Sequence, residues 1–411
     1  MDATSRREDS AGSSDTQSLS SILMFIPNCW DERKGRIKKG TLISQLGDRA
    51  APGEMRPCAA NPGVAVLQKS ARADHLELRA DYIRNLQGAG PPPEDTVKTD
   101  AAITGKAQPV ILRNALFLLG YALAYGALLF CVHRFEGFEL GEPLLVLGLM
   151  GGGFSALAWW VTRNAVPLPC TVKQPAREVV LLLLYILPLV VYLTWGRNAL
   201  HLERIPEPGQ SLIILAIKLL LVVAIPAVMI RFAGGYQWRE LFEFRGAGRH
   251  FWPAFWMCVA IIALQCVLGS GLTAIHQSAF ARSTLVMAAP LLYLFLLVEV
   301  GLVEEFFCRV LLQTRLAAWL KSEVGGLVGM SLIFGLMHAP GLYYRSAATQ
   351  EAVGAHPSWL MAIGYSIVIT SVAGFFLGVL WIRTRNLLLL MAVHAAGDLV
   401  PNFVPMLKNW L

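Results

Sequence analysis

The stretch that decides the fold is LLYLFLLVEVGLVEEFFCRVLLQTR, residues 291–315. Its first thirteen residues carry one charge, Glu299, and the same apolar run then holds Glu304, Glu305 and Arg309. Charged side chains within an apolar run of membrane-spanning length are costly, so intramembrane carboxylates are candidates for a functional site. The simpler interpretation is a helix that leaves the bilayer here, with its charges in water.

The spacing of these charges predicts different surroundings for the two glutamates. On a helix Glu305 and Arg309 are four residues apart with the acid nearer the N-terminus, which is the favoured order for an ion pair. Glu304 lies about 100° round the helix axis from Glu305, so it can face a different cavity. We therefore expect Arg309 to hold Glu305 and to leave Glu304 available for chemistry.

The composition indicates an integral membrane protein. Of the 411 residues, 55% are hydrophobic and 15% are charged, and the mean hydropathy is +0.52. Apolar segments of about 20 residues recur along the chain, each long enough to cross a bilayer as a helix. The seven cysteines are scattered without a CxxC pair, which favours neither a disulfide framework nor a cysteine metal site. The net charge of +7 comes without a basic stripe or an RNA-binding signature, so we expect contact with anionic lipid and none with nucleic acid.

We predict an all-α polytopic membrane protein with about eight to nine transmembrane helices. Nine spans can be placed, at about residues 114–132, 143–162, 179–195, 211–230, 251–272, 285–308, 324–340, 358–382 and 386–405. Fifteen Lys and Arg residues flank alternate ends of these spans and six flank the others, an asymmetry that puts the N-terminus in the cytoplasm. No internal repeat is evident and polar residues are scarce in the first five spans, which argues against a transporter.

Three regions follow from this pattern. Residues 1–108 are rich in Ser, Asp and Thr near the N-terminus and contain the linker GAGPPPED, so we expect a mostly disordered cytosolic tail. A regulatory or partner-binding arm is the alternative for this region. Residues 109–283 form accessory transmembrane helices, in which Lys218 is the clearest buried charge. Residues 284–411 form the third region, whose spans hold the polar clusters.

The polar clusters of the last four spans are three short motifs: Glu304-Glu305 with Arg309, FGLMH ending at His338, and HAAGD from His394 to Asp398. His394 and Asp398 are four residues apart, so they share one helix face. A lone histidine in an apolar helix is usually a packing residue. Two histidines, one aspartate and two glutamates confined to the last third of the chain instead favour a shared site.

In this order the motifs EExxxR, FxxxH and HxxxD resemble the CPBP (CAAX protease and bacteriocin-processing) family of intramembrane proteases. The resemblance covers about residues 285–405 and implies a glutamic-type endopeptidase, with residues 284–411 as its catalytic four-helix core. It implies that Glu304 is the general base with His338 beside it, and that His394 and residue 398 line the oxyanion side. Glu305 and Arg309 would hold the helix and tune the base. The family often has Asn at the last position, where this chain has Asp398.

The chemistry agrees with this resemblance. Peptide hydrolysis needs an activated water, and a glutamate in an apolar cavity is a better base near neutral pH. Histidines can orient that water and stabilise the developing negative charge. An ionised Asp only accepts hydrogen bonds, so Asp398 is either protonated or orients His394. Two His with a Glu and an Asp could instead bind zinc, although no HExxH motif is present.

We therefore expect an intramembrane endopeptidase that hydrolyses a peptide bond in a membrane-associated protein or peptide. We expect no cofactor, with zinc as the alternative, and the expected partners are the substrate and the lipid bilayer. A non-catalytic CPBP-like scaffold or bacteriocin immunity protein is the second functional class, and a zinc-dependent intramembrane metalloprotease is the third. The expected location is the bacterial inner (plasma) membrane, with several passes and a cytoplasmic N-terminus.

Overall fold

The computed structural model describes residues 100–196, 199–242, 247–344, 353 and 356–411. The described residues from Ile111 to Leu411 belong to one compact unit. Of a second unit, residues 33–110, only the beginning of the first helix is described. The predicted tail, residues 1–108, therefore lies outside the described residues, apart from the helix start at Asp100.

Nine helical segments in the described residues are long and apolar enough to cross a membrane, and these residues contain no strand. The predicted all-α polytopic fold is thereby confirmed. The segments, called the first to ninth spans below, are Val110–Glu136, Gly141–Val161, Pro175–Gly196, Gly209–Gly234, Gly248–Leu268, Arg282–Leu320, Glu323–Tyr344, Trp359–Thr384 and Leu387–Trp410.

Several spans are divided, because ordinary α-helical turns alternate with wider π-helical turns, which are labelled η together with two short 3-10 turns. In chain order the elements are α2 (Asp100–Glu136), α3 (Gly141–Val146), η4 (Leu147–Phe154), α4 (Ser155–Val161), α5 (Pro175–Val191), η5 (Tyr192–Gly196), η6 (Leu202–Arg204), α7 (Gly209–Lys218), η7 (Leu219–Ala224), α8 (Ile225–Gly234), α9 (Trp238–Leu241), η8 (Ala247–His250), α10 (Phe251–Leu268), α11 (Gly271–Gln277), α12 (Arg282–Leu296), η9 (Leu297–Leu302), α13 (Val303–Glu305), η10 (Phe306–Gln313), α14 (Thr314–Leu320), α15 (Glu323–Tyr344), α16 (Trp359–Tyr365), η12 (Ser366–Thr370), α17 (Ser371–Thr384) and α18 (Leu387–Trp410).

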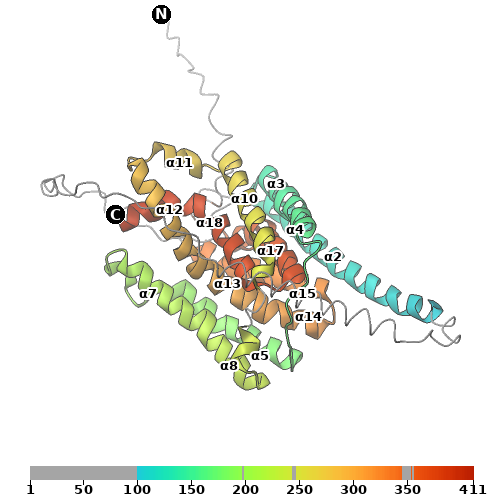
Figure 1. Cartoon of the computed structure of the whole chain (residues 1–411). Helices are drawn as coiled ribbons and strands as arrows, with labels where there is room; N and C mark the ends of the chain where they lie inside the picture. Colours follow the sequence, from blue (N-terminus) through green and yellow to red (C-terminus); the bar gives the residue numbers. More distant parts are fainter. Residues whose placement is uncertain (1–99, 197–198, 243–246, 345–352, 354–355) are drawn as a thin grey trace, which may run out of the picture. The chain divides into compact units, whose positions relative to one another are not determined.

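The eighth and ninth spans form the centre of the unit, where α17 and α18 are drawn in red (Figure 1). In the most apolar stretch of these two spans 83% and 78% of the residues are buried, whereas each of the first five spans has 17% to 22%. α18 packs against α10, α12 and η9, and α17 packs against α15 and α4. The outer spans can leave apolar side chains exposed, because lipid tails are as apolar as leucine.

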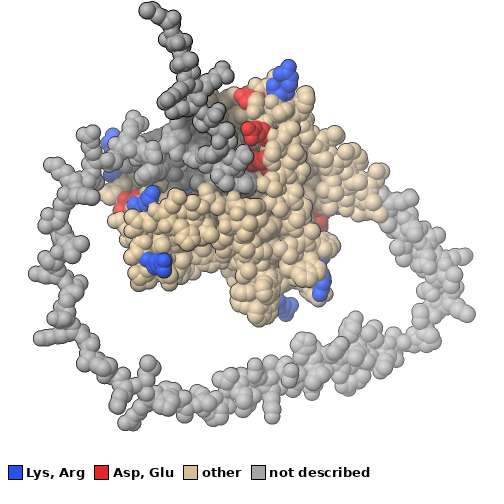
Figure 2. All heavy atoms as spheres, turned by 90° about the horizontal axis from the view of Figure 1, so that it is seen from above, with Lys and Arg blue, Asp and Glu red and all other residues tan. Residues whose placement is uncertain are grey.

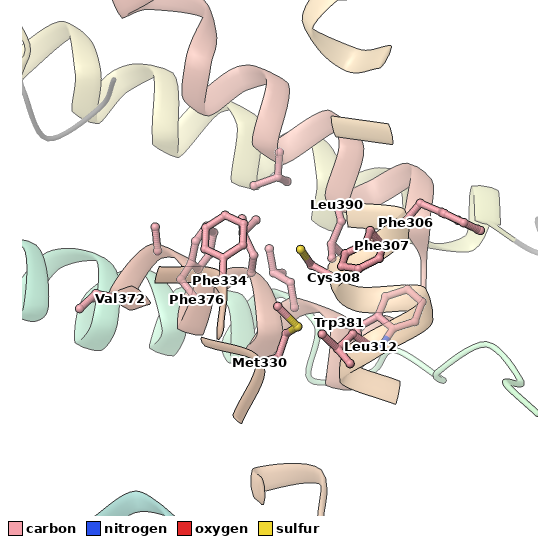
Figure 3. Close-up of a cluster of buried hydrophobic side chains, with 14 of the residues drawn as sticks. Phe306, Phe307, Cys308, Leu312, Met330, Phe334, Val372, Phe376, Trp381 and Leu390 are labelled. Carbon is pink, nitrogen blue, oxygen red and sulfur yellow. The ribbon is translucent and has the colours of Figure 1, made fainter. Parts of the chain in front are cut away.

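Aromatic and aliphatic side chains from four spans fill the space between them (Figure 3). Phe306 and Phe307 come from the sixth span, and they are fully buried together with Phe334 of α15, Phe376 of α17 and Leu390 of α18. Inside a bilayer such packing is stabilised by van der Waals contact rather than by removal of apolar surface from water. This core therefore depends on close fit between the helices.

The sixth and ninth spans approach each other closely at Gly301. A Cβ atom at this position would lie 2.7 Å from the carbonyl oxygen of Met391 and 2.9 Å from its Cα atom. Any larger residue would push the two helices apart, since both atoms belong to the backbone of α18. Gly301 thus sets the distance at which the side chains of the EExxxR motif meet those of the HxxxD motif.

The sixth span is longer than predicted. The sequence pattern ended it at residue 308, whereas the helix continues to Leu320. That boundary was wrong because Arg309 and Arg315 do not face water: each is buried beside a carboxylate on a helix. These two arginines were among the fifteen cations counted on that side, and leaving them out as buried gives thirteen against six.

A buried ion pair joins the third and sixth spans. Nε of Arg315 lies 2.6 Å from Oε2 of Glu178 on α5, and both side chains are almost fully buried. The hydroxyl of Tyr236 donates to Oε1 of Glu178 at 2.9 Å. Tyr236 lies between spans, and burial raises its pKa to about 12, so it remains a neutral donor.

The surface agrees with a multi-pass membrane protein. Figure 2 shows broad areas without charged side chains, and the Lys, Arg, Asp and Glu residues gather in a few places. Large apolar side chains such as Leu119 and Phe130 of α2 are exposed. Contiguous apolar surface of this extent is typical of contact with lipid.

Replacing Glu178 with Gln should lower the melting temperature of the protein in detergent, because Arg315 then stays buried without a counter-charge. Breaking a buried pair typically costs about 3–5 kcal/mol. Glu323→Gln is the matched control, because Glu323 pairs with Arg385 but its side chain is 50% exposed. That change should cost less than about 1 kcal/mol. Equal melting temperatures for the two variants would contradict the assignment of the Glu178 pair as a structural anchor.

Candidate active site

Glu305 is the centre of a buried group that connects the sixth and ninth spans. Its Oε2 accepts a hydrogen bond from Nε of Arg309 at 3.0 Å, and its Oε1 lies 2.7 Å from Nδ1 of His394. None of the three residues is more than 5% exposed. The predicted pair of Glu305 and Arg309 is present, and the bond to His394 also joins the EExxxR motif to the HxxxD motif.

Glu304 has different surroundings from its neighbour. It is partly exposed, and its Oε2 is buried without a hydrogen-bond partner in the described part of the chain. The π-helical segments η9 and η10 lie on either side of α13, the short element that carries both glutamates. Such segments are rare and occur frequently at functional sites. Both carboxylate oxygens of Glu305 are therefore hydrogen-bonded, whereas Oε2 of Glu304 has no partner among the described residues.

His338 lies on α15 beside the ring of Phe334. Its Nδ1 is 2.7 Å from the carbonyl oxygen of Phe334, and the two ring centres are 4.7 Å apart. Because Nδ1–H donates to that carbonyl, a neutral His338 carries its lone pair on Nε2. The guanidinium of Arg309 lies over the same Phe334 ring, 5.1 Å from its centre. The FxxxH motif thus places one aromatic ring in contact with two polar side chains of the predicted site.

His394 and Asp398 line one small cavity, as their spacing predicts. The remaining walls are apolar and come from Met150, Ile261, Phe334, Ala373, Phe376, Leu377, Val393 and Gly397. The space is about 20 Å³, which is enough for about one water molecule. Asp398 is fully buried, and neither of its carboxylate oxygens has a hydrogen-bond partner among the described residues. Its carboxyl group is therefore available to a water or a substrate in this cavity.

Polar contacts, several of them buried, reach the last four spans from the accessory spans. Lys218 of α7 pairs with Glu299 of η9, and the sequence had indicated Lys218 but not its partner. Glu178 and Gln265 were missed, although both are fully buried. Glu178 stands beside Arg177 at a span end, where charges are ordinary. Gln265 is a lone amide in an apolar span, and no motif surrounds it.

The described residues contain no group of three His, Cys, Asp or Glu side chains placed to hold a metal ion. His338 bonds to the backbone of its own helix, and His394 bonds to Glu305. Zinc sites in proteins usually have three or four protein ligands. A histidine that bonds through Nδ1 can still bind a metal through Nε2, so zinc binding stays a prediction from the sequence.

A comparison with protein families matches residues 286–400 to the type II CAAX prenyl endopeptidase Rce1-like family. This segment is similar to that family and is called the Rce1-like domain below. It contains all three motifs, from Glu304 to Asp398, and thereby confirms the resemblance to the CPBP proteases. The first five spans precede the Rce1-like domain. No characterised protein and no solved structure matches the chain.

Glu305→Gln should lower the melting temperature of the protein, because Arg309 loses its counter-charge inside the core. The expected loss is about 3–5 kcal/mol. Glu304→Gln is the matched control and should leave the melting temperature nearly unchanged, because Glu304 makes no hydrogen bond in the described residues. Thermal unfolding in detergent compares the two. If Glu304→Gln destabilises the protein as much as Glu305→Gln, the two glutamates do not differ as described.

Proposed function

We propose that this protein is an intramembrane endopeptidase that hydrolyses a peptide bond in a membrane-associated protein or peptide. The contrast between the two adjacent glutamates is the observation that most supports this proposal. Glu305 is bonded on both oxygens, whereas Glu304 keeps a buried oxygen without a partner. An unpartnered carboxylate in a membrane span does not stabilise the fold, so its presence points to function. The Rce1-like domain supports the same class of activity.

Glu304 would activate the attacking water. Its carboxylate accepts a proton from the water while the water oxygen attacks the carbonyl carbon of the peptide bond, and the same proton then goes to the leaving amine. His338, fixed through Nδ1 by the Phe334 carbonyl, would direct Nε2 toward that water. The proposal assigns no step to a metal or another cofactor.

His394 and Asp398 would stabilise the oxyanion that forms. A doubly protonated His394 donates through Nδ1 to Glu305 and keeps Nε2–H for the oxyanion. A protonated Asp398 can donate in the same cavity, since neither of its oxygens is engaged. Glu305 and Arg309 then act through His394, which they hold in position. The six predicted residues would thus divide into a side that activates water and a side that binds the oxyanion.

The substrate we propose is the tail of a sorted, lipidated or secreted polypeptide held at the membrane. The other partner is the lipid bilayer, and no nucleic acid is involved. Thirteen Lys and Arg residues in loops or near span ends on one side, against six on the other, support a cytoplasmic N-terminus. We propose the bacterial inner (plasma) membrane as the location.

Glu304→Gln should abolish cleavage of a membrane-anchored test peptide by the protein in liposomes. The amide keeps the size of the side chain but cannot accept the proton, and general-base catalysis typically contributes about 10²–10⁴-fold. Glu323→Gln should keep full activity, because Glu323 is not one of the predicted site residues and its side chain, which pairs with Arg385, is 50% exposed. Retained turnover in Glu304→Gln would refute its role. A wild type that binds the peptide without cleaving it would instead favour a scaffold.

The zinc hypothesis is tested by chelation and by Asp398→Asn. Exhaustive chelation should leave activity unchanged, and Asp398→Asn should keep or raise activity because an amide supplies a donor to the oxyanion. If zinc were bound, chelation would abolish cleavage. Asp398→Asn would then cost about 10–100-fold through a lost or misoriented ligand. Activity that is lost on chelation and restored by zinc alone would contradict the metal-free mechanism.

A further inference from the structure

The ninth span lacks one of its helical hydrogen bonds beside the proposed oxyanion site. In an α-helix the N–H of each residue donates to the carbonyl four residues earlier. Pro401, inside α18, has no N–H, so the carbonyl of Gly397 lacks its partner within the helix. An unsatisfied carbonyl is costly within an apolar span, because no water is present to replace the bond. Something else must therefore donate to Gly397.

The side chain of Gln265 supplies this donor. Gln265 lies on α10, is fully buried, and donates through Nε2 to the carbonyl oxygen of Gly397. Ile261, one turn earlier on α10, lies against Gly397 and lines the cavity that also contains His394 and Asp398. The fifth span is thus attached to the catalytic helix at the point where the helix loses its own hydrogen bond.

The carbonyl that lacks its helical hydrogen bond is adjacent to the residues of the proposed site. Gly397 directly precedes Asp398, and the side-chain amide of Asn402 donates to the Asp398 carbonyl at 2.8 Å. Two side-chain amides therefore bond to consecutive carbonyls of α18. A proline that removes a helical hydrogen bond lets the two halves of a helix change direction relative to each other. The direction of Asp398 depends on what fixes this part of α18.

We propose that Gln265 is a positioning residue of the protease. By bonding the carbonyl that Pro401 releases, it sets the direction in which Asp398 and His394 face their cavity. The inference rests on the proposed function and deepens it. Gln265 lies outside the segment 286–400 that matches the family, so the inference adds a residue that the family match does not cover. The accessory spans then contribute to catalysis as well as to the fold.

The test is a double-mutant cycle of Gln265→Met and Pro401→Ala in the full-length protein in liposomes. Methionine keeps the approximate length of the side chain without an amide, and alanine at position 401 returns an N–H to the Gly397 carbonyl. For all four proteins, kcat and KM for a membrane-anchored test peptide are measured together with the melting temperature. Gln313→Met is the matched control, because buried Gln313 also donates to a glycine carbonyl, that of Gly378, at 3.1 Å.

Gln265→Met should lower kcat by up to about tenfold with little change in KM, which corresponds to the loss of one hydrogen bond. With Pro401→Ala already present, the same change should have almost no effect on kcat. Gln313→Met should lower the melting temperature and leave kcat unchanged. If Gln265 served folding alone, Gln265→Met would lower the melting temperature, and its effect on kcat would be the same with Pro401 as with Pro401→Ala.

Full kcat in Gln265→Met would overturn the inference, and so would an equal loss of kcat with and without Pro401. Equal losses of kcat in Gln265→Met and Gln313→Met would also overturn it, because they would show general destabilisation. Cleavage that is absent or independent of Glu304 in the wild type would refute the proposed function and this inference with it. Cleavage that requires Glu304 but not Gln265 would refute this inference alone.

Discussion

Glu305 is bonded to Arg309 on its own span and to His394 on the ninth span, and the site depends on this bridge. A carboxylate buried in a low-dielectric core must be paired, and removing either partner would leave a charge without compensation. The close approach at Gly301 brings the two spans to the distance that the bridge needs. The Glu305 bridge also fixes its two partners: Arg309 is held over Phe334, and His394 is held at the wall of the cavity.

The accessory spans are attached to the Rce1-like domain by polar side chains. Three such contacts come from the third, fourth and fifth spans: Glu178 to Arg315, Lys218 to Glu299, and Gln265 to Gly397. Interhelical hydrogen bonds in membranes contribute about 0.6–2 kcal/mol each. Their main effect is to fix register, because apolar helix surfaces can slide past each other in lipid without a large change in energy. The positions of the outer spans are therefore tied to the residues of the core.

Much of the fold could be predicted from the sequence, because nine apolar segments of spanning length have few other solutions in a membrane. The pair of Glu305 and Arg309 was also predictable, since it depends only on helical spacing. The end of the sixth span was not, because Arg309 and Arg315 resemble loop cations until their partners are known. Glu178 lies 137 residues from Arg315, and Glu305 lies 89 residues from His394. Contacts at such separations depend on how the helices pack, which no local pattern contains.

The central claim is that water activated by Glu304 attacks the peptide bond directly while Glu305 remains bound to Arg309 and His394. A single-turnover cleavage in H₂¹⁸O, with protein in excess over a membrane-anchored peptide, tests it most directly. Mass spectrometry then locates the label in the peptide products and in the protein. The account predicts one ¹⁸O atom in the new carboxylate of the product and none in Glu304. Label in Glu304 would show a covalent acyl intermediate on that residue and would contradict the account.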